Sequence, residues 1–118
     1  MNETHVRTIN VAETEWPARV KIPAHRILTG APAASTLTLE ESGTHQLGLW
    51  QVTPGAFTTD HAGYLEYIHV TKGRGRLVSD TGVVQELSPG TTTVIPVDWK
   101  GRWEIDNTLT KVYTIIRT

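Results

Sequence analysis

The sequence contains no cysteine, so disulfide bonds, thiolate metal ligands and a cysteine nucleophile are all excluded. It has no apolar run near the roughly 18 residues that a membrane-spanning helix needs. Neither sign of charge is in excess, because 11 Lys and Arg residues stand against 12 Asp and Glu residues. A nucleic-acid-binding domain of this size normally carries a basic excess, so we expect no nucleic-acid partner.

The N-terminal residues lack both the basic region and the apolar region of a secretory signal peptide. Together with the missing membrane segment, this predicts a protein of the cytoplasm that needs no membrane. The length of 118 residues is room for one ordinary domain.

Residues that favour β-strands are abundant. Thr, Val and Ile make up about a third of the chain, and their branched side chains suit a pleated sheet. No stretch keeps a helical apolar period over three turns, so we expect little or no helix. Turn signals at short intervals predict an antiparallel sandwich or barrel. The expected strands cover residues 36–40, 47–53, 64–71, 75–79, 83–87, 92–95, 102–105 and 111–117.

The first third of the chain is less regular. Its pattern is compatible with an edge strand over residues 6–11 and a short strand over 19–22, followed by a loop over 30–34. We therefore predict one domain in which residues 1–35 form N-terminal strands and an irregular arm. Residues 36–118 would form the barrel.

Several groups of Gly, Pro, Trp and Glu residues resemble the signature of single-domain cupins. The groups are the segment 49–57, Glu66-x6-Gly73, Leu87-Ser88-Pro89-Gly90-x5-Pro96 and Gly101-x-Trp103. The chain is similar, over roughly residues 47–117, to the branch that contains ureidoglycine aminohydrolase and the ethanolamine-utilisation cupin. This resemblance implies an all-β, cupin-type double-stranded β-helix, or jelly-roll barrel, with a ligand cavity inside.

The resemblance also implies a divalent metal site, of which this sequence keeps half. Cupins usually bind the metal through two or three His and one Glu, and here Glu66 matches the carboxylate and His61 one histidine. Thr59 or Gly63 takes the other first-motif position, depending on where the count starts, and Gly101 replaces the second-motif His. A stable first-row metal site normally draws three or four protein ligands. The missing ligands therefore disfavour a divalent metal without excluding one, the cofactor stays open, and His61 and Glu66 are the candidate metal ligands.

Glu66 is the most informative residue of the predicted strand 64–71. Alternation places it on one face with Tyr64, Ile68 and Val70, and a carboxylate in such surroundings is rarely buried without a partner. Burial would raise the pKa of Glu66 toward the range of a general acid or base, so Glu66 and His61 are the candidate catalytic residues. The alternative is that Glu66 pairs with an Arg, a Lys or a Tyr hydroxyl and is structural.

Aromatic residues could form the walls of the expected cavity. Trp50, Tyr64, Trp103 and Tyr113 are the candidate substrate-binding residues, although a Trp or Tyr in a small β-domain also serves core packing. Lys111 shares a strand face with Tyr113, so either both point into the barrel or the lysine extends to solvent.

Two functions are compatible with these features. The first is an enzyme that binds a small polar metabolite and hydrolyses or isomerises a ureido, amide or carboxylate compound, with Glu66 moving a proton and His61 assisting. The alternative is a non-catalytic, ligand-binding or structural cupin that has lost its metal site. In either case we expect a homodimer, formed through the outer face of Leu65, Tyr67 and His69 or by exchange of the first strand.

Overall fold

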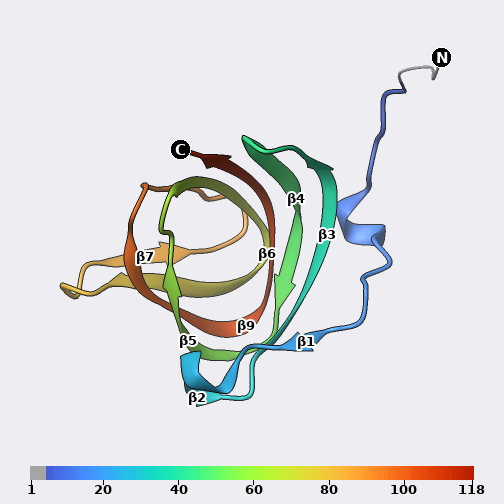
Figure 1. Ribbon diagram of the computed structural model, residues 1–118. Helices are drawn as coiled ribbons and strands as arrows, with labels where there is room; N and C mark the ends of the chain where they lie inside the picture. The colour runs from blue at the N-terminus through green and yellow to red at the C-terminus, as the bar shows by residue number, and fades with distance from the viewer. Residues whose placement is uncertain (1–4) are drawn as a thin grey trace.

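The computed structural model describes residues 5–118, which form one curled antiparallel sheet (Figure 1). The four N-terminal residues, on which part of the signal-peptide prediction depends, lie outside the described residues. The strands are β1 (Val20–Lys21), β2 (Ile27–Gly30), β3 (Ala33–Glu41), β4 (His45–Val52), β5 (Gly55–Asp60), β6 (Tyr64–Ser79), β7 (Val84–Leu87), β8 (Thr92–Ile95) and β9 (Lys100–Arg117). The two short 3₁₀ turns are η1 (Val11–Glu13) and η2 (Ala24–Arg26). The predicted all-β barrel with little helix is therefore confirmed.

The two longest strands, β6 and β9, connect all parts of the curled sheet. Its main path runs β1-β3-β4-β9-β5-β2, while β6 pairs with β7, β8 and β9. The first half of β9 lies between β5 and the end of β6, and its second half lies between β4 and the start of β6. The strands consequently curl around a common interior (Figure 1). No helix of residues 5–118 is long and apolar enough to cross a membrane.

The expected separation of residues 64–71 and 75–79 into two strands is wrong, because β6 continues through both segments. The ladder between β6 and β9 shifts register three times between Val70 and Gly75, so the strand bulges and bends instead of ending. Gly73 makes the bend possible: its φ is 88°, and a Cβ there would lie 2.2 Å from the carbonyl oxygen of Thr108. The same continuity joins the two segments expected near the C-terminus into the single strand β9.

Alternation along the strands sends one set of side chains into the barrel. On β6, Ile68 and Val70 are fully buried, whereas Tyr67, which precedes Ile68 and points to the opposite face, is 43% exposed. The core is mainly aliphatic with aromatic members, namely Ile22, Val52, Phe57, Ile68, Val70, Leu77, Leu87, Ile95, Trp103, Ile105, Leu109 and Tyr113.

The N-terminal segment contributes short strands to the same sheet. The short strand expected over residues 19–22 is present as β1, which pairs with β3, and β2 pairs with β5. The edge strand expected over residues 6–11 is wrong, because residues 5–10 have no regular structure and run outside the barrel beside β3 (Figure 1). Val6 is 96% exposed, so the alternation of apolar and polar residues in this segment does not correspond to a buried strand face.

Candidate functional site

The loop before β6 holds His61 against the loop that follows β8. The backbone N–H of His61 donates to the carbonyl of Trp99 at 2.9 Å, and the N–H of Asp98 donates to the carbonyl of His61 at 2.9 Å. Asp98 occupies the left-handed region with φ 66°, a conformation that Asp tolerates better than most residues. Its carboxylate accepts from the N–H of Gly63 at 3.0 Å, which closes the link between the two loops. The His61 ring is thereby fixed in the barrel interior.

Glu66, His61 and Lys111 form a buried hydrogen-bonded chain. His61 Nε2 lies 2.8 Å from Glu66 Oε1, and Lys111 Nζ donates to Glu66 Oε2 at 2.6 Å. The Glu66 and Lys111 side chains are each 6% exposed and that of His61 is 2% exposed. Lys111 and Tyr113 are both buried in the barrel, so of the two alternatives for Lys111 the inward one is correct and the extension to solvent is wrong.

Glu66 stays ionised, contrary to the expectation that burial would raise its pKa. Burial does act to raise it, but the Lys111 ammonium and the hydrogen bonds from His61 and Lys111 outweigh burial and lower the pKa to about 2. An ionised carboxylate only accepts hydrogen bonds, so His61 Nε2 carries the proton between them. In the neutral ring, Nδ1 is then the acceptor, and it lies 3.5 Å from the Thr59 hydroxyl.

Aromatic rings surround the Lys111 ammonium. Its Nζ lies 4.3 Å from the ring centre of Trp50, 4.6 Å from that of Trp103 and 5.6 Å from that of Tyr113. The register explains the first contact, because Trp50 on β4 is the direct partner of Lys111 on β9. The faces of aromatic rings attract cations. These three rings, called the aromatic wall below, therefore stabilise the buried charge together with Glu66.

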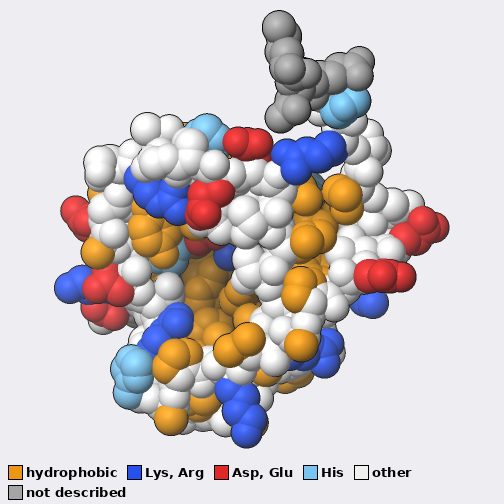
Figure 2. Space-filling model, turned by 45° about the vertical axis from the view of Figure 1, so that its right-hand side comes forward, with side chains coloured by type: hydrophobic (Ala, Val, Ile, Leu, Met, Phe, Trp, Pro, Cys, Tyr) orange, Lys and Arg blue, Asp and Glu red, His pale blue; other side chains and the backbone are white. Residues whose placement is uncertain are grey.

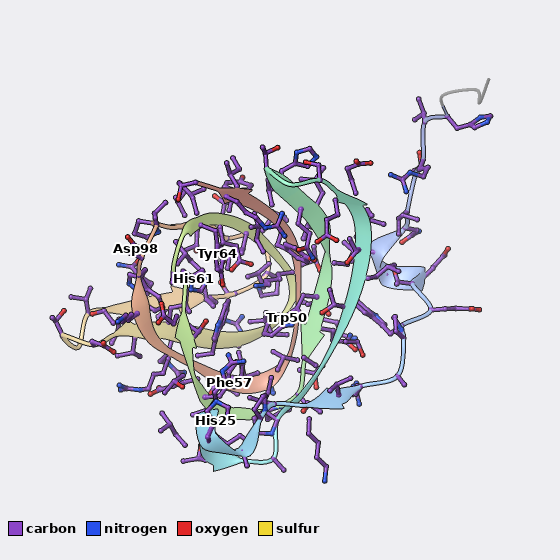
Figure 3. All side chains as sticks on the ribbon, in the orientation of Figure 1. His25, Trp50, Phe57, His61, Tyr64 and Asp98 are labelled. Carbon is purple, nitrogen blue, oxygen red and sulfur yellow. The ribbon has the colours of Figure 1, made fainter. Side chains whose placement is uncertain are left out.

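A cavity of about 240 Å³ lies beside this chain of side chains. Figure 2 shows a hollow in the barrel lined by hydrophobic side chains, and in Figure 3 Trp50, His61 and Tyr64 lie within the ring of strands. Arg26 from η2 also lines it, with Nε donating to the carbonyl of Thr58 at 2.9 Å. The lining residues are Ile22, Arg26, Thr36, Gln46, Trp50, Phe57, Thr59, His61, Tyr64, Glu66, Trp103, Lys111, Tyr113 and Ile115.

Two tyrosine hydroxyls add polar groups to the lining. Burial raises the pKa of both Tyr64 and Tyr113, so both hydroxyls keep their protons at neutral pH. Gln46 Nε2 donates to the Tyr113 hydroxyl at 2.7 Å. This position of the ring requires Gly48 opposite it on β4, because a Cβ there would lie 2.7 Å from the hydroxyl oxygen. The cavity therefore combines apolar walls with neutral and charged hydrogen-bonding groups.

All six predicted site residues line this one cavity: Trp50, His61, Tyr64, Glu66, Trp103 and Tyr113. Two basic residues that the sequence reasoning did not include among them, Lys111 and Arg26, line it as well. The sequence feature that pointed to Lys111 is its spacing of two residues from Tyr113, which places both side chains on the same face of the strand. Arg26 belongs to the least regular part of the sequence and has no comparable signal.

The donor set does not fit the usual cupin metal. Among residues 5–118, no group of three or more His, Cys, Asp or Glu side chains lies close enough together to hold a metal ion. Of the positions that the family signature marks, His61 and Glu66 carry ligand side chains, while Thr59 and its cross-strand partner Gly101 do not. Two protein ligands are fewer than a stable first-row metal site needs.

Comparisons with known proteins agree with this architecture. The family described as the EutQ-like cupin domain matches residues 39–113. The EutQ protein of Clostridium difficile has a similar structure, with a TM-score of 0.72 and 18% identity over 93% of this chain and 86% of that one. A Pseudomonas syringae protein of unknown function gives a TM-score of 0.77 at 18% identity over 87% of this chain and 45% of that one. Ectoine synthase from P. lautus gives 0.63 at 15% identity over 78% and 68%. None of the curated proteins matches this sequence.

Proposed function

Because this chain belongs to the EutQ-like cupin domain family, we propose that its barrel binds a small organic anion of the carboxylate class. The observation that carries the proposal is the charge of the cavity lining. Two cations, Lys111 and Arg26, stand against one carboxylate, Glu66, so a ligand with one negative charge would balance the site.

The size and walls of the cavity fit a small metabolite. A volume of about 240 Å³ corresponds to about eight water molecules. The aromatic wall offers apolar surface, while the tyrosine hydroxyls and Gln46 offer hydrogen bonds that fix an orientation. A buried ion pair rarely stabilises a fold more than apolar packing would, so its presence beside a cavity supports a role in binding.

Binding calorimetry on the wild-type chain tests this function with a matched series: propionate, propionamide and propylamine. We expect propionate to bind and its neutral and cationic counterparts to bind at least about tenfold more weakly, because a charged hydrogen bond contributes about 1.5–3 kcal/mol. Arg26→Gln should weaken propionate binding by a similar factor.

The matched control is Arg19→Gln, since Arg19 is exposed and does not line the cavity. This variant should leave the affinity for propionate unchanged. Equal binding of acid and amide, or no binding of any of the three, would rule out a carboxylate site.

A second candidate is an enzyme acting on a ureido, amide or carboxylate compound. The contact that favours it is the 2.8 Å hydrogen bond between His61 and Glu66, since a carboxylate that orients an imidazole is a common proton-transfer arrangement. In this version Glu66 is a positioning residue and His61 moves the proton, because the low pKa of Glu66 makes it a weak base. A bound compound that is turned over by the wild type and not by His61→Gln would favour the enzyme.

The homodimer stays a prediction. On the outer face of β6, Tyr67 is exposed and lies opposite the exposed Val94 of β8, while Leu65 lies opposite the exposed Ile116 of β9. We propose that these adjacent apolar side chains are the surface through which two copies associate.

A further inference from the structure

The Lys111 ammonium contacts Glu66, and Glu66 in turn contacts His61, the other cupin ligand residue that this chain retains. It contacts one Glu66 oxygen at 2.6 Å, and the other Glu66 oxygen contacts His61 Nε2 at 2.8 Å. Both carboxylate oxygens, which would otherwise be free to bind a cation, are therefore occupied by groups of the chain itself. Each of the three side chains is at least nine-tenths buried, so water does not compete for these contacts.

The aromatic wall holds the ammonium in this place. The ring centres of Trp50 and Trp103 lie 4.3 and 4.6 Å from Lys111 Nζ, and the side chain of Lys111 is 6% exposed. A divalent ion at Glu66 would have to displace a cation that is already stabilised by a carboxylate and by ring faces. Without that displacement, two cations would share one carboxylate and repel each other.

We propose that Lys111 takes the place of the divalent metal in this cupin site, so that the chain's own ammonium neutralises Glu66 and excludes metal ions from the barrel. The inference goes beyond the proposed function. It concerns the same cavity, but it does not depend on which ligand binds there. A site of this kind carries its positive charge permanently, whatever the supply of metal or the presence of a chelator.

The geometry also indicates how a metal site could be restored. The Thr59 hydroxyl lies 3.5 Å from His61 Nδ1, so a side chain at position 59 borders the cavity. Glu66 and His61 line the same cavity, so a histidine at position 59 would raise the number of candidate ligand side chains there to three, which is the minimum of a typical site. Position 101 cannot serve, because a Cβ on Gly101 would lie 2.3 Å from the carbonyl oxygen of Val78.

The first experiment uses the wild-type chain with Zn²⁺ and Mn²⁺ as probes. Elemental analysis after purification without chelator, followed by calorimetric titration with each ion, should show no stoichiometric binding at micromolar concentration. One equivalent of a divalent metal that survives dialysis would overturn the inference, as would a titration endpoint near one ion per chain.

The second experiment compares Thr59→His/Lys111→Met with Thr59→His/Lys72→Met. Lys72 is an exposed lysine of β6 that does not line the cavity, so the two double variants lose the same type of charge. We expect Zn²⁺ at a hundred times its Kd to raise the Tm of the first by about 10 °C and to leave that of the second unchanged. Equal zinc responses of the two variants would overturn the inference.

Loss of the ammonium leaves Glu66 buried without its cation, so the first variant is expected to be unstable in the absence of metal. Refolding with Zn²⁺ then provides the same readout, since recovery that depends on zinc supports the replacement of metal by Lys111. If the Thr59→His/Lys111→Met variant folds neither with nor without Zn²⁺, the metal titration of the wild-type chain decides whether metal ions are excluded.

These results are independent of the propionate measurements. A wild-type chain that binds both propionate and one metal ion contradicts the metal replacement and leaves the carboxylate site intact. A chain that binds neither contradicts the carboxylate site alone.

Discussion

The same two strands, β6 and β9, carry a charge cluster outside the barrel and another inside it. Outside, Arg76 on β6 pairs with Glu104 and Asp106 on β9 and with Glu86 on β7. These side chains are between 26% and 70% exposed. Inside, Glu66 and Lys111 are each 6% exposed. The two clusters use the same kinds of groups and differ in contact with water.

Water determines what each cluster contributes. Exposed ion pairs contribute about 0–1 kcal/mol, because the solvent screens both charges and stabilises either one alone. A buried charge that loses its partner has no such substitute, and breaking a buried pair costs about 3–5 kcal/mol. The inner cluster also borders a cavity, whereas the outer one faces bulk solvent. The outer cluster therefore belongs to the surface of the protein, and the inner cluster belongs to the site.

Lys111→Met should produce the largest change. We expect it to lower the free energy of unfolding by about 3–5 kcal/mol at pH 7, because Glu66 then stays buried without its cation. Glu66→Gln/Lys111→Met removes both charges and should recover much of the loss. Urea unfolding curves of the wild type and both variants measure the difference. Equal stability of the single and double variants would show that the two charges are not coupled.

Acid should weaken the inner cluster by a somewhat smaller amount. The pKa of Glu66 is about 2 in the folded chain against its ordinary 4.5, so its contribution is fully present above about pH 4.5 and is lost as the pH falls toward 2. The total is about 3 kcal/mol, from a difference of about 2.5 pKa units. Glu66→Gln lacks this contribution, so the stability gap between wild type and variant should close across that window. A gap that stays constant with pH would mean that Glu66 does not titrate as described.

Arg76→Met should produce the smallest change. The hydrogen bonds that Arg76 donates to Asp106 raise the pKa of Arg76, yet the partly exposed setting limits the effect of removing Arg76 to about 1 kcal/mol or less. Salt at 1 M should reduce that difference further, since it screens exposed charges. Denaturant unfolding at low and high salt measures both effects. A loss as large as that of Lys111→Met would abolish the distinction between the two clusters.

The positions of most strands along the chain and the aromatic site residues follow from local patterns. Alternation and turn signals identify most strands after residue 36, and the spacing from Glu66 to Gly73 identifies the cupin barrel. The continuity of β6 does not follow, because a glycine that permits a bulge and a glycine that ends a strand look the same in sequence. The expected strand over residues 6–11 fails for a related reason: alternation does not reveal whether a neighbouring strand exists.

The charge state of Glu66 could not be predicted from its neighbours in the chain. Its cation, Lys111, lies 45 residues later and becomes its partner only through the curvature of the sheet. Alternation assigns Lys111 to the same face as Tyr113 but does not say which face is interior. Lysine is also among the residues least often buried, so the residue type alone predicts that Lys111 lies at the surface. Burial alone thus predicted a raised pKa where the assembled site lowers it.

The pairing of β6 with β9 also limits how the chain can fold. Side chains of a β-strand alternate between the two faces of the sheet. If the register of β9 against β6 shifted by one residue, Lys111 would point toward solvent and the Glu66 carboxylate would stay in the interior without its cation. Apolar positions discriminate weakly against such misalignment when both faces carry branched residues, as they do here. The internal ion pair therefore favours the observed register of β6 and β9 over registers that are shifted by one residue.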